Sequence, residues 1–155
     1  MRKRDKSILG KVKELIFGKM TKIENDFFGE MIDAGNYYEC RKLFRPIGKV
    51  VEIGLEKKEQ GPDEKQKKFF NWIENNYDLL IEKVSPSIER RVQDWLSNYE
   101  VKDFQSEYTL EYLYIPRCDE GVFDWQISFY VENELQHWCS LEMRGLEVIE
   151  ILIDG

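Results

Sequence analysis

The chain has 155 residues, which is a usual length for one domain and enough to bury a core without disulfide or metal support. Apolar residues make up 42% of it and aromatic residues 14%, a composition that excludes a disordered chain. Residues 1–23 hold eight basic side chains against two acidic ones, so residues 24–155 carry 15 basic and 28 acidic side chains. Such an anionic body repels phosphate backbones and attracts cationic proteins, so we expect no nucleic-acid binding.

The cysteines and the distribution of apolar residues indicate a cytoplasmic protein. Cys40, Cys118 and Cys139 are widely spaced and form no CxxC pair, and only His137 could join them in a metal site. No stretch approaches 18 apolar residues, and charged residues interrupt the basic start before a signal-type apolar run develops. We therefore expect reduced thiols, no metal or other cofactor and no stable membrane association.

The first segment of the chain is basic and amphipathic. From Ser7 to Met20 apolar residues recur at spacings of three and four, which predicts a short helix with a lysine-rich outer face. These residues are Ile8, Leu9, Val12, Leu15, Ile16 and Met20. We treat residues 1–23 as a basic N-terminal helix or extension and residues 24–155 as a single α+β domain. The extension either packs on that domain or contacts anionic lipid or a partner.

Strands and then helices are expected in the first part of the domain. Residues 27–31 and 37–44 read as two strands around a hairpin, and residues 47–55 as a third strand after Pro46. The sequence Gly61-Pro62-Asp63 opens the clearest helix, whose apolar stripe runs to Val84. A second helix is predicted to start at Ser85-Pro86, with a stripe that continues through Trp95, Leu96 and Tyr99.

After residue 105 the apolar period changes from about 3.6 to 2, which predicts a sheet with one buried face. Tyr108, Leu110, Tyr112 and Tyr114 share one side of the first of these strands. Residues 123–131, 135–141 and 149–153 continue as strands, with turns at 116–121, 132–134 and 144–145. The predicted fold is α+β with two layers: a mostly antiparallel sheet of five to six strands, two consecutive helices on one face and the N-terminal amphipathic helix.

The sequence contains no recognisable catalytic motif. His137 lies in the apolar phase of a predicted strand, where a core or interface histidine is the better interpretation, and no serine or cysteine sits in a nucleophile motif. Cys118 has the acidic neighbours Asp119 and Glu120, which would raise its pKa and make it a poor nucleophile. Glycine motifs for phosphate binding are missing. We therefore expect a protein that is not an enzyme.

Acidity is concentrated in the C-terminal strands. Residues 107–155 hold eleven acidic side chains against Arg117 and Arg144, with Tyr130 and Trp138 interleaved on the expected outward side. An aromatic anchor ringed by carboxylates suits a basic protein partner. The predicted partner-binding residues are Asp119, Glu120, Asp124, Tyr130, Glu132, Glu134, Trp138 and Glu142. The alternative interpretation is a soluble acidic sheet face whose aromatic side chains lie under the helices.

Three segments carry a resemblance to a known group of proteins. These are Phe27-Phe28-Gly29-Glu30, the strand from Gly48 to Ile53, and the helix opening from Gly61 to Phe70. The pattern resembles small bacterial domains of unknown function that occur beside polymorphic toxins, and so resembles immunity proteins. The resemblance implies a cytoplasmic protein that binds and blocks its own toxin, often a nuclease. The basic N-terminal segment is not part of that pattern, and no catalytic residues carry over.

The leading hypothesis is therefore an immunity-type inhibitor that binds and neutralises a cognate bacterial toxin, expected to be a basic nuclease, through an acidic surface. A non-catalytic adaptor or regulatory module is the alternative, binding a peptide on a sheet edge or in a groove between helices and sheet. A third hypothesis is an enzyme with an unrecognised site around His137 or a carboxylate pair.

Overall fold

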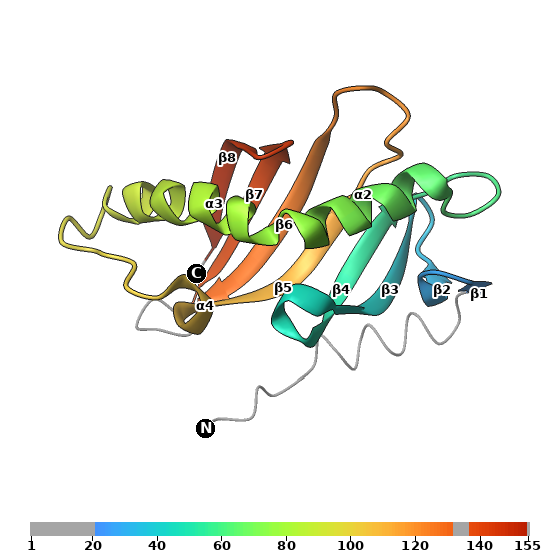
Figure 1. The fold of residues 1–155 in the computed structure, drawn as a ribbon, viewed down its shortest axis with the longest axis horizontal. Helices are drawn as coiled ribbons and strands as arrows, with labels where there is room; N and C mark the ends of the chain where they lie inside the picture. Colours follow the sequence, from blue (N-terminus) through green and yellow to red (C-terminus); the bar gives the residue numbers. More distant parts are fainter. Residues whose placement is uncertain (1–20, 132–136, 155) are drawn as a thin grey trace.

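The computed structural model describes residues 21–131 and 137–154, and within them a single sheet of eight strands follows the order of the sequence (Figure 1). All neighbouring strands are antiparallel except β4 and β5, which are parallel. The predicted α+β class with a mostly antiparallel sheet is confirmed. The strands are β1 (Lys22–Asn25), β2 (Gly29–Asp33), β3 (Tyr37–Phe44), β4 (Lys49–Glu56), β5 (Tyr108–Ile115), β6 (Asp124–Val131), β7 (Trp138–Arg144) and β8 (Glu147–Asp154).

The predicted number of five to six strands is wrong, since the sheet has eight, and β1 is the strand that no predicted segment covered. Strand β1 has the sequence KIEN, which is too short and too polar to show a period of two. Phe27 and Phe28 belong to the turn that follows it, where their backbone N–H groups donate to Asn25 Oδ1, each at 2.9 Å. This Asn-centred turn reverses the chain, so that β2 begins only at Gly29.

Two long helices, α2 (Glu64–Asn75) and α3 (Tyr77–Val92), lead from β4 toward β5 and cover one face of the sheet (Figure 1). A parallel strand pair needs such a crossover because a tight turn cannot join its ends. The predicted start of the first helix is confirmed, since Asp63 Oδ1 accepts hydrogen bonds from the N–H groups of Lys65 and Gln66 at 3.1 and 3.2 Å. A short 3-10 helix, η1 (Arg45–Ile47), and a short helix, α4 (Phe104–Glu107), complete the described elements.

The boundary between the two long helices lies at Asn76, and the predicted start of the second helix at Ser85-Pro86 is wrong. Asn76 leaves the helical conformation with φ −108° and ψ 13°, and its Nδ2 donates to the Trp72 carbonyl at 2.8 Å. Pro86 instead lies inside α3 and is exposed, so a signature that often starts a helix here occupies a helix interior. The predicted stripe also ran too far, because α3 ends at Val92 and Trp95 and Leu96 are exposed.

The hydrophobic core lies between this helical layer and the sheet. Phe70 of α2 meets the rings of Phe28 and Phe44 edge-on, with ring centroids 6.0 Å apart in both pairs. Every second residue of β6 and β7 faces this layer, as the predicted alternation requires. The inward-facing residues of these two strands are Trp125, Ile127, Phe129, Val131, Cys139, Leu141 and Met143.

A β-bulge in β5 changes which tyrosines face the core. The pairing register with β6 shifts between Leu110 and Tyr112, so one extra residue enters β5 there. Leu113 and Ile115 therefore point into the core with none of their surface exposed. The sequence pattern had placed Tyr112 on the same side as Leu110, and this is wrong because an inserted residue reverses the alternation beyond it.

The predicted N-terminal amphipathic helix and the predicted turn at residues 132–134 lie outside the described residues.

Candidate partner-binding face

The face of the sheet opposite the helices is the candidate binding surface, and we call it the open face. None of the helices in residues 21–131 and 137–154 packs on it. Alternation along each strand determines which residues lie on this face, and strand register aligns them in rows that run across the strands. Each row is about 7 Å from the next, since a strand rises about 3.3 Å per residue and every second residue shares a face.

One row is apolar and exposed. In β3 and β4, Leu43 lies opposite Val50, and these side chains are 53% and 61% exposed. In β6 and β7, Tyr130 lies opposite Trp138, with the two rings 5.4 Å apart and edge-on. Trp138 is 42% exposed despite its size. We call Leu43, Val50, Tyr130 and Trp138 the apolar row.

A second row, two steps along the same strands, is acidic. Glu39 lies opposite Gly54 in β3 and β4, whereas Glu142 of β7 lies opposite Glu150 of β8. Like charges directly opposite one another on a sheet destabilise the pairing, so this arrangement favours a cationic group above it. We call Glu39, Glu142 and Glu150 the acidic row.

The row between these two has short side chains at its centre. Ser128 of β6 lies opposite Ser140 of β7, and their hydroxyls are 2.9 Å apart and hydrogen bonded. Ser128 is only 8% exposed although it belongs to the open face. We call this the middle row; its members are Arg41, Glu52, Tyr112, Ser128, Ser140 and Leu152.

The open face as a whole carries a large excess of negative charge. Within the described ranges, strand alternation places ten carboxylates and three cations on it. Each cation already has a carboxylate partner: Lys22 with Glu30, Arg41 with Glu52, and Arg144 with Asp124. The ten carboxylates are Glu24, Glu30, Glu39, Glu52, Glu56, Asp124, Glu142, Glu147, Glu150 and Asp154.

Tyrosines that the sequence pattern assigned to the core contribute to this face. A side chain at Gly54 would overlap the Tyr112 hydroxyl, so the glycine leaves room for the ring of Tyr112 above β4. Burial, and then the nearby Glu39 carboxylate, raise the pKa of Tyr112, and burial likewise raises the pKa of Tyr114. Both phenols therefore remain protonated near neutral pH. Tyr112 and Tyr114 lie on the open face only because of the bulge at Glu111, and no sequence signal marks that bulge.

The structure brings together three of the predicted partner-binding residues: Tyr130, Trp138 and Glu142 lie on the open face, in β6 and β7. Asp124 lies on the same face at the far end of β6, where Arg144 donates to both of its carboxylate oxygens at 2.8 and 3.1 Å. Arg144 lowers the pKa of Asp124. Glu132 and Glu134 lie outside the described residues.

Asp119 and Glu120 lie away from the sheet, in the loop between β5 and β6. Asp119 accepts from Lys58 Nζ and from Arg117 Nε, each at 2.9 Å, and these hydrogen bonds lower the pKa of Asp119 to about 2. The same Lys58 ammonium, which is buried, also donates to Asp63 at 2.5 Å. The charge of Asp119 is therefore balanced by cations of the fold itself.

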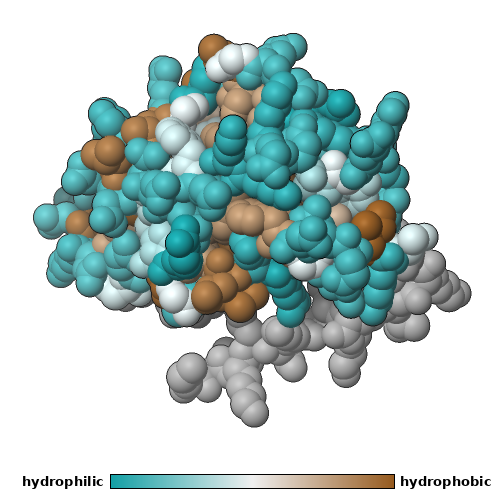
Figure 2. Space-filling view, turned by 45° about the vertical axis from the view of Figure 1, so that its right-hand side comes forward, coloured by the Kyte–Doolittle hydropathy of each residue, from teal (hydrophilic) through white to brown (hydrophobic). Residues whose placement is uncertain are grey.

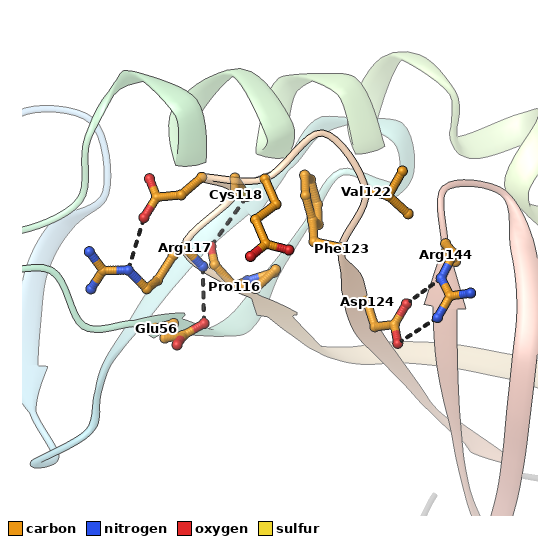
Figure 3. Close-up of a pocket in the computed structure, with 10 residues that line it drawn as sticks. Glu56, Pro116, Arg117, Cys118, Val122, Phe123, Asp124 and Arg144 are labelled. Atoms are coloured by element: carbon orange, nitrogen blue, oxygen red, sulfur yellow. Dashed lines mark hydrogen bonds and ion pairs between the residues drawn. The ribbon is translucent and has the colours of Figure 1, made fainter.

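A pocket lies beside this loop (Figure 3). The ion pair of Asp124 with Arg144 closes one side of it, and Arg117, whose backbone N–H donates to Glu56 Oε2 at 3.1 Å, lies on the other. Cys118, which contributes to the lining, donates its thiol to the Pro116 carbonyl at 3.2 Å. Most of the charged groups in this pocket already pair with one another, so it offers less to a partner than the open face does.

The thiols have the chemistry of buried groups. Burial raises the pKa of Cys40, Cys118 and Cys139 to about 12, so each is protonated at neutral pH. His137 lies just before β7, and its Nδ1 is buried without a hydrogen-bond partner. Among the residues that the structure places, no three histidine, cysteine or acidic side chains are grouped as metal ligands would be.

Across the placed residues, each helix is too short or too polar to cross a bilayer. Figure 2 shows a surface that is mostly hydrophilic, with apolar residues in scattered patches. Comparisons with protein-family models, with curated proteins and with solved structures found no match.

Proposed function

We propose that this chain acts by binding, without catalysis, and that it takes a cationic protein partner on its open face. The observation that carries the proposal is the excess of carboxylates on that face beside the exposed Trp138, which stacks edge-on with Tyr130. Aromatic side chains are frequent anchors of binding energy in interfaces, and complementary charge speeds encounter and orients the partner.

The particular form that we propose is an immunity-type inhibitor of a basic toxin. A nuclease must present a cationic groove to the phosphates of its substrate, and an anionic face of similar extent can occupy that groove. The resemblance of the segments around Phe27, Gly48 and Gly61 to immunity proteins adds to this proposal.

The choice of residues for the test follows from the ion pairs. Reversing the charge of Asp119 or Asp124 would break contacts to Lys58, Arg117 and Arg144, so an effect on binding would be mixed with an effect on folding. Glu142 and Glu150 are better choices, because they lie opposite each other and reversing both charges exchanges one like-charge pair for another, which leaves the repulsion between β7 and β8 unchanged. The test variant is therefore Glu142→Lys with Glu150→Lys.

The experiment expresses the basic polypeptide encoded next to this chain in cells, with and without the chain. We expect wild-type chain to restore growth, and E142K/E150K to bind that polypeptide several-fold more slowly and to protect less. The control is Asp78→Lys with Glu82→Lys, which reverses two exposed charges on α3. Equal protection and equal association rates for all three proteins would refute the proposal.

The adaptor hypothesis is favoured by a different observation, the apolar row. An apolar peptide could lie along Leu43 and Val50 without needing the carboxylates. The dependence of affinity on salt concentration distinguishes the two functions, because screening weakens a charge-driven complex strongly and an apolar one little. Affinity that falls about tenfold or more between 50 and 500 mM salt supports the cationic partner; affinity that is constant and is lost in Trp138→Ala supports the adaptor.

A further inference from the structure

The two edges of the sheet differ in length and in chemistry. Strand β1 has four residues, KIEN, and its short length and charged lysine and glutamate protect it from pairing with another chain. Strand β8 has eight residues, EVIEILID, of which five are Val, Ile or Leu and none is lysine or proline. Among the described residues β8 has a neighbour on one side only, because it is the last strand in the sheet order. This long apolar edge is therefore the one that is open to a further strand.

One hydrogen bond shows which backbone groups of β8 an added strand would use. The Val131 N–H donates to the His137 carbonyl at 2.9 Å, so His137 directs its backbone groups toward β6. This direction alternates along an antiparallel strand, so the even-numbered residues of β7 direct their backbone groups toward β8 and bond the residues opposite them, which include Leu152. The N–H and C=O groups of Ile151 and Ile153 therefore point away from the sheet.

The side chains along this edge are apolar on one side of the sheet and acidic on the other. Ile151 and Ile153 are half-buried on the helical side, where they pack against the core, and α3 contacts β8. On the open face, Glu150 and Asp154 flank Leu152, which is 56% exposed. Neither carboxylate has an ion-pair partner within the described part of the chain. A strand added here would meet apolar side chains on the helical side and carboxylates on the open face.

The charge of β8 favours a different chain over a second copy as the occupant of this edge. Glu147, Glu150 and Asp154 give the strand three negative charges and no positive one, so pairing of two β8 strands would bring like charges together. A register shift with β7 makes Ile149 an extra residue, and such a bulge limits the length over which another strand can pair. The regular part of the edge, from Glu150 to Asp154, therefore suits a short strand that carries positive charge.

We propose that the cationic partner adds an extended segment to the edge of β8, antiparallel to it. This inference rests on the proposed function, and it names the part of the partner that the chain recognises: about five residues in which basic and apolar side chains alternate. The apolar residues lie opposite Ile151 and Ile153 and exchange backbone hydrogen bonds with them, while the basic residues lie beside Glu150 and Asp154. In this mode of recognition the backbone supplies affinity and the alternating side chains supply specificity.

The direct test uses the intact chain and a synthetic peptide in which lysine and valine alternate and both ends are blocked. We expect saturating peptide to slow hydrogen exchange of the Ile151 and Ile153 amides about tenfold or more, measured by NMR, because both amides gain a hydrogen bond. The Leu152 amide, which already bonds β7, should change little. Protection of Ile151 and Ile153 without peptide, together with sedimentation as a dimer, would assign the edge to a second copy and overturn the inference.

Methylation of the peptide backbone supplies matched controls. N-methylation of the valines should abolish binding, because their N–H groups face β8, whereas N-methylation of the lysines should leave binding nearly unchanged, because those N–H groups face away. A peptide with glutamate in place of lysine should not bind, since it would add charge of the same sign. Equal affinity of the two methylated peptides, or binding of the glutamate peptide, would contradict the addition of a basic strand.

A pair of variants at one position separates this inference from the proposed function. Ile151→Pro removes the outward N–H and takes no bond from the pairing with β7, whereas Ile151→Ala shortens the side chain and keeps that N–H. We expect the neighbouring basic polypeptide to bind I151P about tenfold more weakly than I151A. Equal binding of both, with the effect of E142K/E150K retained, would refute strand addition alone. Peptide binding at the edge of a chain that ignores the polypeptide would uphold the edge site and refute the proposed function.

Discussion

At the scale of single residues, the ion pairs around Lys58 make the stability of the fold depend on pH. The folded chain holds the pKa of Asp119 at about 2 through hydrogen bonds from Lys58 and Arg117, whereas an unfolded aspartate has a pKa of about 3.9. A depressed folded pKa adds stability that is fully present above the unfolded value and is lost as pH falls toward the folded one.

We therefore expect the difference in unfolding free energy between wild type and Asp119→Asn to shrink as pH falls from 5 to 2. The reason is that wild-type Asp119 becomes protonated in that range and then resembles the asparagine. Urea unfolding at a series of pH values measures this difference. A difference that stays constant or grows toward acid would contradict the assigned ion pairs.

Gly54 provides a second residue-scale prediction. In Gly54→Ala the added methyl group would meet Tyr112 Cζ at 3.0 Å and Tyr114 Cδ2 at 3.1 Å, so the Tyr112 ring has to swing outward. We expect a loss of about 1 kcal/mol in unfolding free energy, at the low end for overpacking because the ring tip lies on the open face. Gly121→Ala, where nothing lies within 4 Å of the added methyl group, is the matched control and should be nearly neutral.

At the scale of elements, α3 contains a proline that removes one hydrogen bond from its interior. Pro86 cannot donate to the Glu82 carbonyl one turn earlier, and its ring crowds that carbonyl. We expect Pro86→Ala to raise the unfolding free energy by about 1 kcal/mol, since the helix regains the bond while the unfolded chain gains some freedom.

Pro46 is the matched control for this change. It lies in the first turn of η1, where the helix needs no backbone N–H donor. Pro46→Ala should therefore lower the unfolding free energy by about 0.5 kcal/mol. Denaturant unfolding of both variants measures whether each substitution raises or lowers the unfolding free energy. A loss of stability in Pro86→Ala would mean that the ring itself packs usefully in α3.

At the scale of the whole molecule, one sheet and one helical layer join the two halves of the chain. Strands β4 and β5 pair along Glu52–Leu55 and Tyr112–Ile115, and the helices that connect them pack on both halves. We expect Ile53→Val and Ile127→Val each to lower stability by about 1 kcal/mol and to shift the entire unfolding transition. Circular dichroism and tryptophan fluorescence should coincide; a two-step transition would show that the halves unfold separately.

Features that depend on local interactions could be predicted from the sequence, whereas features that depend on residues far apart along the chain could not. The Asp63 cap is local, so the start of α2 was predictable, and simple alternation placed Tyr130 and Trp138 on the outward side of β6 and β7. The β5 bulge depends on pairing with another strand, and no local pattern marks it. The ion pair of Asp119 with Lys58 joins residues 61 positions apart, so the balanced charge of that predicted site residue could not be read from the sequence.

The order of the strands has a consequence for the kinetics of folding. Since β1 to β8 lie in the sheet as they occur along the chain, almost every strand pairs with the one made just before it. Short-range pairing of this kind favours fast folding. Only β4 and β5 must find each other across a long connection, so we expect closure of that parallel pair to be the slow step, after each hairpin has already formed.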